Sequence, residues 1–202
     1  MKKVLYIILF FILYGQSAIS QDAMTLIENN IQFTDGANNL TFTLYHERGF
    51  KKEGSWGYTD YIYLDDNWAE ILHGFYYMPG NVMFALYGGL ETDGMKFRPG
   101  AYIMWNMLDN LTLNLFGEYG QGDDNYWYDT SLKWIAKDVD TYALFVQPRA
   151  RRGHGIGLPI GYTKKNIFGS DGIEGSLTLA PFYNYEEETN PWNLTIFMAV
   201  EF

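Results

Sequence analysis

Amides, carboxylates and aromatic rings recur at every second position in several segments of this sequence, the spacing that places side chains on one face of a β-strand. In residues 111–118, three leucines at positions 111, 113 and 115 alternate with Thr112, Asn114, Phe116 and Glu118. Rings on such a face can stack on a flat, uncharged solute while polar groups hydrogen-bond its hydroxyls, or the same groups can pair with one another and fill the space. Equivalent positions elsewhere extend this candidate solute-binding set to Asp60, Tyr102, Asn106, Asn114, Phe116, Glu118, Asp129, Lys133 and Gln147.

Motifs for enzymatic chemistry are absent from the sequence. The only histidines are His46, His73 and His154, and there is no Gly-x-Ser-x-Gly, His-Glu-x-x-His or phosphate-cradling glycine-rich loop. A hydrolase site pairing His154 with Ser170 or an aspartate is the strongest enzymatic alternative, but the expected strand order puts Ser170 at the opposite end of the fold. We therefore predict no enzymatic activity, no metal site and no cofactor.

The first 20 residues have the organisation of a secretory signal peptide. A short basic start at Lys2 and Lys3 precedes an apolar run over residues 4–14, and small residues follow at Ala18 and Ser20. The run is shorter than the roughly 20 apolar residues that a spanning helix needs. We expect cleavage after Ser20, which leaves residues 21–202 as a single domain.

Charge and composition narrow the class of protein further. The chain has 14 basic and 24 acidic residues; without Lys2 and Lys3 the basic count is 12, so the net charge becomes about −12, which argues against nucleic acid as a partner. There is no cysteine, so no disulfide holds this exported chain together. The 17 tyrosines and 6 tryptophans favour a membrane barrel, where such rings form girdles at both interfaces.

The fold class follows from strands and turns along the whole chain. Clusters of Gly, Asn, Asp and Pro separate alternating segments that we expect to be strands. The prediction is an all-β, transmembrane, antiparallel up-and-down β-barrel of 12 strands, with 10 as the alternative, and an even count puts both chain ends in the periplasm. The expected strands are 26–34, 40–48, 55–65, 68–78, 81–91, 96–107, 110–120, 125–136, 139–148, 156–165, 173–185 and 191–202.

The last strand carries a second signal of such a barrel. Every even position from Trp192 to Phe202 is a large apolar residue, so one face should contact lipid while Thr195 and Glu201 face the lumen. A chain that ends in this way on an aromatic residue resembles the clients of the barrel-assembly machinery. Tryptophans at expected strand ends should form the interface girdles, and they are Trp56, Trp68, Trp105, Trp127, Trp134 and Trp192.

A basic patch stands out in this acidic chain. It consists of Arg149, Arg151 and Arg152, in a stretch that we expect to be an extracellular loop. Guanidinium groups match phosphate geometry, so these side chains are predicted to contact lipopolysaccharide or steer an anionic solute. The alternative is that they neutralise acidic loops or fold inward against Glu118 and Asp129.

Two adjacent segments resemble an early part of the Tsx-like outer-membrane channels. Residues 40–47 read LTFTLYHE and end near an acidic residue, and residues 54–65 read GSWGYTDYIYLD, an aromatic strand that ends on aspartate. The rest of the chain resembles that family only in its pattern and its terminal Phe202, and it is shorter than the nucleoside-specific members. The resemblance implies a narrow, monomeric, twelve-stranded channel and the passage of nucleosides.

These observations predict a narrow outer-membrane channel for small solutes. The expected partners are outer-membrane lipid, lipopolysaccharide, the barrel-assembly machinery and the solute, with no nucleic acid. The alternative is a closed structural or binding barrel of the same membrane that transports nothing.

Overall fold

Fourteen antiparallel strand segments make up almost all of the described chain. The computed structural model describes residues 23–34, 37–49, 55–64, 68–92, 96–120, 126–169, 172–188 and 191–202. The segments are β1 Ala23–Thr34, β2 Ala37–Gly49, β3 Trp56–Leu64, β4 Ala69–Tyr77, β5 Val82–Glu91, β6 Phe97–Leu108, β7 Leu111–Tyr119, β8 Tyr126–Val139, β9 Tyr142–Val146, β10 Arg149–Arg151, β11 Gly155–Gly157, β12 Ile160–Lys164, β13 Glu174–Tyr183 and β14 Trp192–Glu201, with a short 3₁₀ turn, η1, at Ile167–Gly169.

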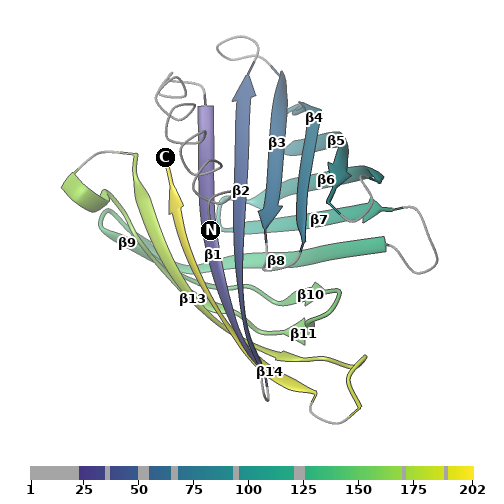
Figure 1. Cartoon of the computed structure of the whole chain (residues 1–202). Helices are drawn as coiled ribbons and strands as arrows, with labels where there is room; N and C mark the ends of the chain where they lie inside the picture. The colour runs from purple at the N-terminus through teal and green to yellow at the C-terminus, as the bar shows by residue number, and fades with distance from the viewer. Residues whose placement is uncertain are drawn as a thin grey trace.

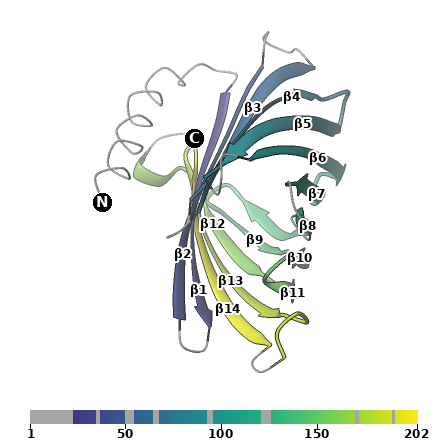
Figure 2. The ribbon, with the colours of Figure 1, turned by 45° about the vertical axis from the view of Figure 1, so that its right-hand side comes forward.

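The sheet closes on itself because the last strand pairs with the first. β14 pairs with β1 on one side and β13 on the other, so the yellow and purple strands lie side by side in both views (Figures 1 and 2). β9 and β10 are one strand interrupted at Pro148, and β11 and β12 are one strand interrupted at Pro159. The result is a closed barrel of 12 strands, as the sequence predicted.

Tight turns connect β4 to β5, β6 to β7 and β8 to β9 at the end of the barrel that carries the C-terminus. This end, here called the terminal end, includes the turn at Pro79 and Gly80, where Gly80 has a φ of 74°. Proline followed by a glycine with positive φ is the signature of a type II turn. The opposite end, here called the loop end, includes the β10–β11 hairpin turn and the connection from β13 to β14.

The outer face of the barrel is apolar and the inner face is mixed. On β14, Leu194 and Met198 are exposed while Thr195 and Phe197 are buried, so the lipid-facing and lumen-facing sets are those predicted from the alternation. The same alternation on the other strands gives an apolar outer belt, as a transmembrane barrel requires. Its exposed members include Ile71, Phe75, Phe84, Leu86, Leu90, Leu115, Leu132, Leu144, Ile160, Leu177 and Leu179.

Four of the six tryptophans lie on this outer face, and two do not. Trp56, Trp105 and Trp134 are exposed on the outside toward the terminal end, and Trp192 is exposed at the loop end. The prediction was wrong for Trp68 and Trp127. Their rings take part in cation–π contacts with Arg98 and Arg151 inside the barrel. A tryptophan at a strand end can therefore pack on an arginine in the lumen instead of lying at the membrane interface.

The outward orientation of Met198 can be tested directly. Met198→Arg places a charge on the lipid face near the middle of β14, which we expect to lower the free energy of unfolding by about 2–4 kcal/mol. The free energy should be measured by urea titration in lipid vesicles. Ala199→Ser on the inner face serves as control, and equal destabilisation by both substitutions would contradict the assignment of the two faces.

Among the residues that the structure describes, no helix is long and apolar enough to cross a membrane.

Candidate functional site: the lumen of the barrel

Eight of the nine candidate solute-binding residues face the lumen. Asp60 is the exception, and its prediction was wrong: it lies on the outer face and bonds to the exposed His73. Its neighbour Thr59 instead points inward and contacts the Tyr87 hydroxyl at 3.4 Å. The eight inward residues are Tyr102, Asn106, Asn114, Phe116, Glu118, Asp129, Lys133 and Gln147.

A row of uncharged polar side chains crosses the inner wall from β6 to β9. The Tyr102 hydroxyl donates to Asn114 Oδ1 at 2.7 Å, and Asn114 Nδ2 donates to Ser131 Oγ at 3.4 Å. Gln147 Nε2 donates to the same Ser131 Oγ at 2.8 Å. Tyr102, Asn114 and Gln147 are only half-buried, although they face the inside of a closed sheet. Water therefore reaches them within the lumen, and each amide can still bind a passing solute.

Aromatic rings form the second part of the inner wall. Phe116 lies at the centre, with ring centroids 5.4 Å from Tyr61, 5.4 Å from Trp127 and 6.0 Å from Tyr87. Leu72 and Ala85 pack under these rings and are almost fully buried. The cluster narrows the barrel on the side of β3 to β8, and Phe116 itself remains half-exposed beside the polar row.

Arg98 holds three carboxylates inside the barrel near the loop end. Its Nη1 donates to Glu91 at 2.7 Å, its Nη2 donates to Glu118 at 2.8 Å, and its Nε lies 3.2 Å from Glu70. All four side chains are at least nine-tenths buried. The guanidinium also lies 5.5 Å from the centroid of the Trp68 ring. This cluster links β4, β5, β6 and β7 across the inner wall.

Two of the three patch arginines point into the lumen, contrary to the expectation of an extracellular loop. The Arg149 guanidinium binds both oxygens of Asp129, with Nε to Oδ1 at 2.7 Å, and the Arg151 Nε lies 3.9 Å from the same carboxylate. Arg149 also lies over the Phe197 ring, 4.9 Å from its centroid. These contacts match the alternative that the arginines fold inward against Asp129, so neither residue is placed to bind lipopolysaccharide.

Arg152 alone remains at the rim. It donates to the Tyr126 backbone carbonyl and lies 4.0 Å from the centroid of the Tyr126 ring. Contact with lipopolysaccharide therefore stays a prediction for Arg152 only.

His154 sits in the β10–β11 turn with its ring against Phe182, at a centroid distance of 5.6 Å. Burial, with the nearby Arg151 and Arg149 charges, lowers the pKa of His154 to about 3, so the imidazole is neutral at physiological pH. Ser170, its expected partner in the hydrolase alternative, lies outside the described residues, and Gly169 beside it lies at the terminal end. No cluster of metal-binding side chains occurs in the described part of the chain.

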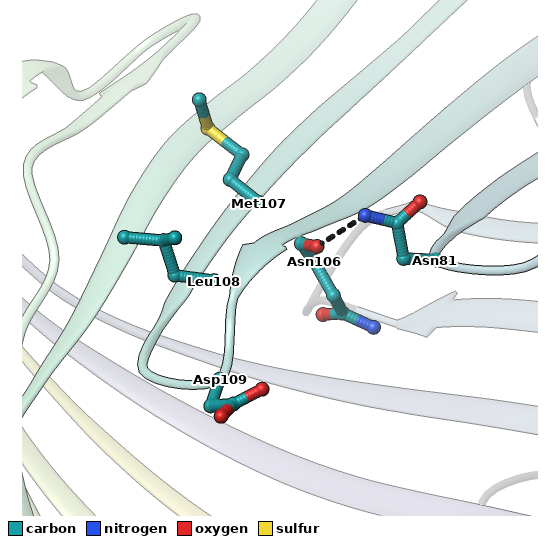
Figure 3. A pocket seen from close by; sticks show the side chains of 5 residues that line it. All are labelled: Asn81, Asn106, Met107, Leu108 and Asp109. Carbon is teal, nitrogen blue, oxygen red and sulfur yellow. Dashed lines mark hydrogen bonds between the residues drawn. The ribbon is translucent and has the colours of Figure 1, made fainter.

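A shallow hollow of about 540 Å³ lies at the terminal end, between the β4–β5 and β6–β7 turns. Asn81 Nδ2 donates to the Asn106 carbonyl at 2.8 Å, which ties the two turns together (Figure 3). The remaining lining residues are Met107, Leu108 and Asp109, all exposed. Turn residues that open to solvent make this hollow part of the rim rather than an enclosed binding site.

The sequence interpretation missed Arg98, Glu70 and Glu91. A signal was present for Arg98, because the alternation of β6 that points Tyr102 inward also points residue 98 inward when it is extended toward the strand start. The same counting on β4 and β5 places the two glutamates beside it. A single arginine on the inward face of a strand, with acidic residues on the inward faces of the neighbouring strands, would have predicted this cluster.

Comparison with known proteins gives a match in structure alone. No protein-family model and no curated protein matches the sequence. The KdgM porin in complex with disordered oligogalacturonate is similar with a TM-score of 0.54 and 10% identity, over 88% of this chain and 98% of that chain. The NanC porin is similar with a TM-score of 0.54 and 8% identity, over the same shares of the two chains. The COG4313 outer-membrane channel from Pseudomonas putida F1 is similar with a TM-score of 0.53 and 8% identity, over 90% of this chain and 95% of that chain. The chain therefore has the fold of outer-membrane β-barrel channels.

Proposed function

We propose that the protein is an outer-membrane channel that passes small, uncharged polar solutes. The observation that carries the proposal is the half-exposed row of Tyr102, Asn114 and Gln147 inside a closed barrel with an apolar outer belt. Neutral donors and acceptors beside the Phe116 ring suit a solute with a flat face and several hydroxyls. Nucleosides have this chemistry, and they are the solutes that the resemblance to Tsx-like channels implies.

The charges of the lumen favour neutral solutes over anions. Near the loop end, three guanidinium groups face four carboxylates, from Glu70, Glu91, Glu118 and Asp129. Each of the three guanidinium groups is engaged by at least one carboxylate. A negatively charged solute would have to compete with these buried ion pairs for the arginines. We therefore expect an acidic sugar such as galacturonate to enter more slowly than a nucleoside.

Several observations support the outer membrane as the location. The signal peptide expected in residues 1–20 lies outside the described residues, and the apolar belt and terminal strand match a barrel of that membrane. We further propose that the barrel-assembly machinery recognises the strand that ends at Phe202.

Asn114 should decide how fast nucleosides pass. Asn114→Leu replaces the central amide of the polar row with an apolar side chain of the same branched shape, and loss of one solute hydrogen bond worth about 1 kcal/mol should slow uridine entry roughly five-fold. Liposome swelling with uridine and with glycerol measures this, and glycerol entry should change less than two-fold. Leu115→Met on the outer face is the matched control. An equal loss for both solutes would mean that Asn114 does not contact the solute.

The second candidate function is a closed barrel that transports nothing. It is favoured by the tight packing of Leu72, Met83, Ala85 and Tyr87, which water barely reaches. Wild-type protein that is folded in liposomes and admits neither uridine nor glycerol would support this candidate over the channel.

A further inference from the structure

A hydrogen-bonded aspartate and histidine lie on the outer face of the barrel, in the middle of the apolar belt. His73 Nδ1 is 2.5 Å from Asp60 Oδ1, and the two side chains are 57% and 32% exposed. Asp60 is the central residue of the nine-residue β3, and His73 is the central residue of the nine-residue β4. Ile71 and Phe75, the outward neighbours of His73 along its strand, are exposed apolar residues.

This position is costly in contact with lipid. A tilted membrane strand takes about 9–11 residues, so the centre of a nine-residue strand lies near the bilayer midplane. Ionisable side chains at that depth are rare, and they mark sites of function or of contact with other protein. Within the described part of the chain, this contact engages only His73 Nδ1 and Asp60 Oδ1, so His73 Nε2 and Asp60 Oδ2 can take a further partner. Hydrocarbon supplies no hydrogen-bonding group to either atom.

We propose that this face binds a second copy of the same chain, with a two-fold axis along the membrane normal between β3 and β4, in place of the monomer that the resemblance to Tsx-like channels implies. Asp60 and His73 are direct register partners on adjacent antiparallel strands, so they lie side by side on the outer face. Rotation by 180° about that axis reverses their order, which places Asp60 of each copy opposite His73 of the other. Asp60 Oδ2 then accepts from His73 Nε2 of the second copy, and every polar atom of the pair is used.

The residues next to Asp60 and His73 on the neighbouring strands fit the same axis. The register continues from Asp60 to His46 on β2, and from His73 to Gly88 on β5. The rotation therefore sets the His46 ring of one copy opposite the glycine of the other, beside the Phe97 ring that packs at Gly88. The tilted rings of Tyr58 and His73, with centroids 6.0 Å apart, add an aromatic surface next to the axis.

The absence of cysteine makes the proposed face testable by single-cysteine cross-linking. Ile71→Cys and Phe75→Cys lie on β4 on either side of His73, whereas Leu179→Cys lies on the outer face of β13, away from the axis. A short bis-maleimide cross-linker applied to isolated outer membranes should give a dimer band for the first two variants and at least ten-fold less for the third. Equal cross-linking of all three, cross-linking only to other proteins, or no dimer at all would overturn the proposal.

A charge exchange tests the pairing itself. In the Ile71→Cys background, Asp60→His sets histidine against histidine and should lower the dimer band at least ten-fold. Adding His73→Asp again sets an aspartate opposite a histidine across the axis and should restore the band. A heat-modifiability gel confirms that each variant is folded. A dimer unaffected by the single change, or not restored by the exchange in folded protein, would refute the Asp60–His73 contact. The result does not depend on solute passage, because it requires only the barrel.

Discussion

Arg98→Ala is expected to lower the free energy of unfolding of the barrel by about 3–5 kcal/mol, because it leaves three buried carboxylates without their cation. The expected loss exceeds that of a surface ion pair, which contributes about 0–1 kcal/mol, since none of the three glutamates can turn to water. Urea titration in vesicles measures the change in the free energy of unfolding, and the folded fraction at each urea concentration is read from the heat-modifiable gel band of the protein.

Arg152→Ala is the matched control for this substitution. Its guanidinium lies at the rim over Tyr126, so the free energy of unfolding should change by less than about 1 kcal/mol. Adding Glu118→Gln to Arg98→Ala removes one of the stranded charges and should recover part of the stability. If Arg98→Ala and Arg152→Ala have the same effect, the Arg98 cluster does not hold β4 to β7 together.

Asp129→Asn is expected to lower the free energy of unfolding by as much as Arg98→Ala, but it removes a negative charge from the lumen where Arg98→Ala removes a positive one. It keeps the shape of the side chain but leaves Arg149 and Arg151 without a carboxylate, so we expect a loss of about 3–5 kcal/mol in the free energy of unfolding. The net charge of the lumen also becomes more positive by one unit. The reversal potential in a KCl gradient should therefore shift toward anion selectivity.

The two lumen variants should move ion selectivity in opposite directions. Arg98→Ala removes a positive charge from the lumen and should shift the reversal potential toward cations, whereas Asp129→Asn should shift it toward anions. Met198→Lys, which adds a charge outside the lumen, is the control for both. A shift in the same direction for both variants would show that these clusters do not line the path of the ions.

The strands were predictable because two independent signals agree. Period-two alternation defines each strand, and turn residues such as Pro79 and Gly80 mark where it ends, so most strand boundaries in the structure lie within a few residues of those expected. The inward set on β7 followed for the same reason, since leucine on one face and polar or aromatic residues on the other leave a single orientation.

The orientation of β3 was not predictable in this way. Tyr58 and Asp60 on one face alternate with Thr59 and Tyr61 on the other, so both faces mix aromatic and polar residues and the period identifies neither as outer. The structure resolves this through Thr59, whose hydroxyl contacts Tyr87 inside the barrel. The outward contact between Asp60 and His73 was missed as a consequence.

The arginine patch was misplaced because the expected strand ended at Pro148, which put the arginines in the loop after it. Proline has no N–H to donate to the sheet, but its carbonyl still accepts, and Leu132 donates to it at 2.9 Å. The strand therefore continues through Arg149 and Arg151, and their alternate positions both point inward toward Asp129. Only the residue after the strand, Arg152, reaches the rim.

Single-channel recording of the purified, folded protein in planar bilayers tests the central claim most directly. We expect discrete conductance steps that uridine reduces in a concentration-dependent way, with a weaker effect of galacturonate at the same concentration and a weaker effect of uridine on Asn114→Leu. Folded protein that gives no conductance steps, or steps that galacturonate blocks more strongly than uridine, would contradict a channel for uncharged solutes.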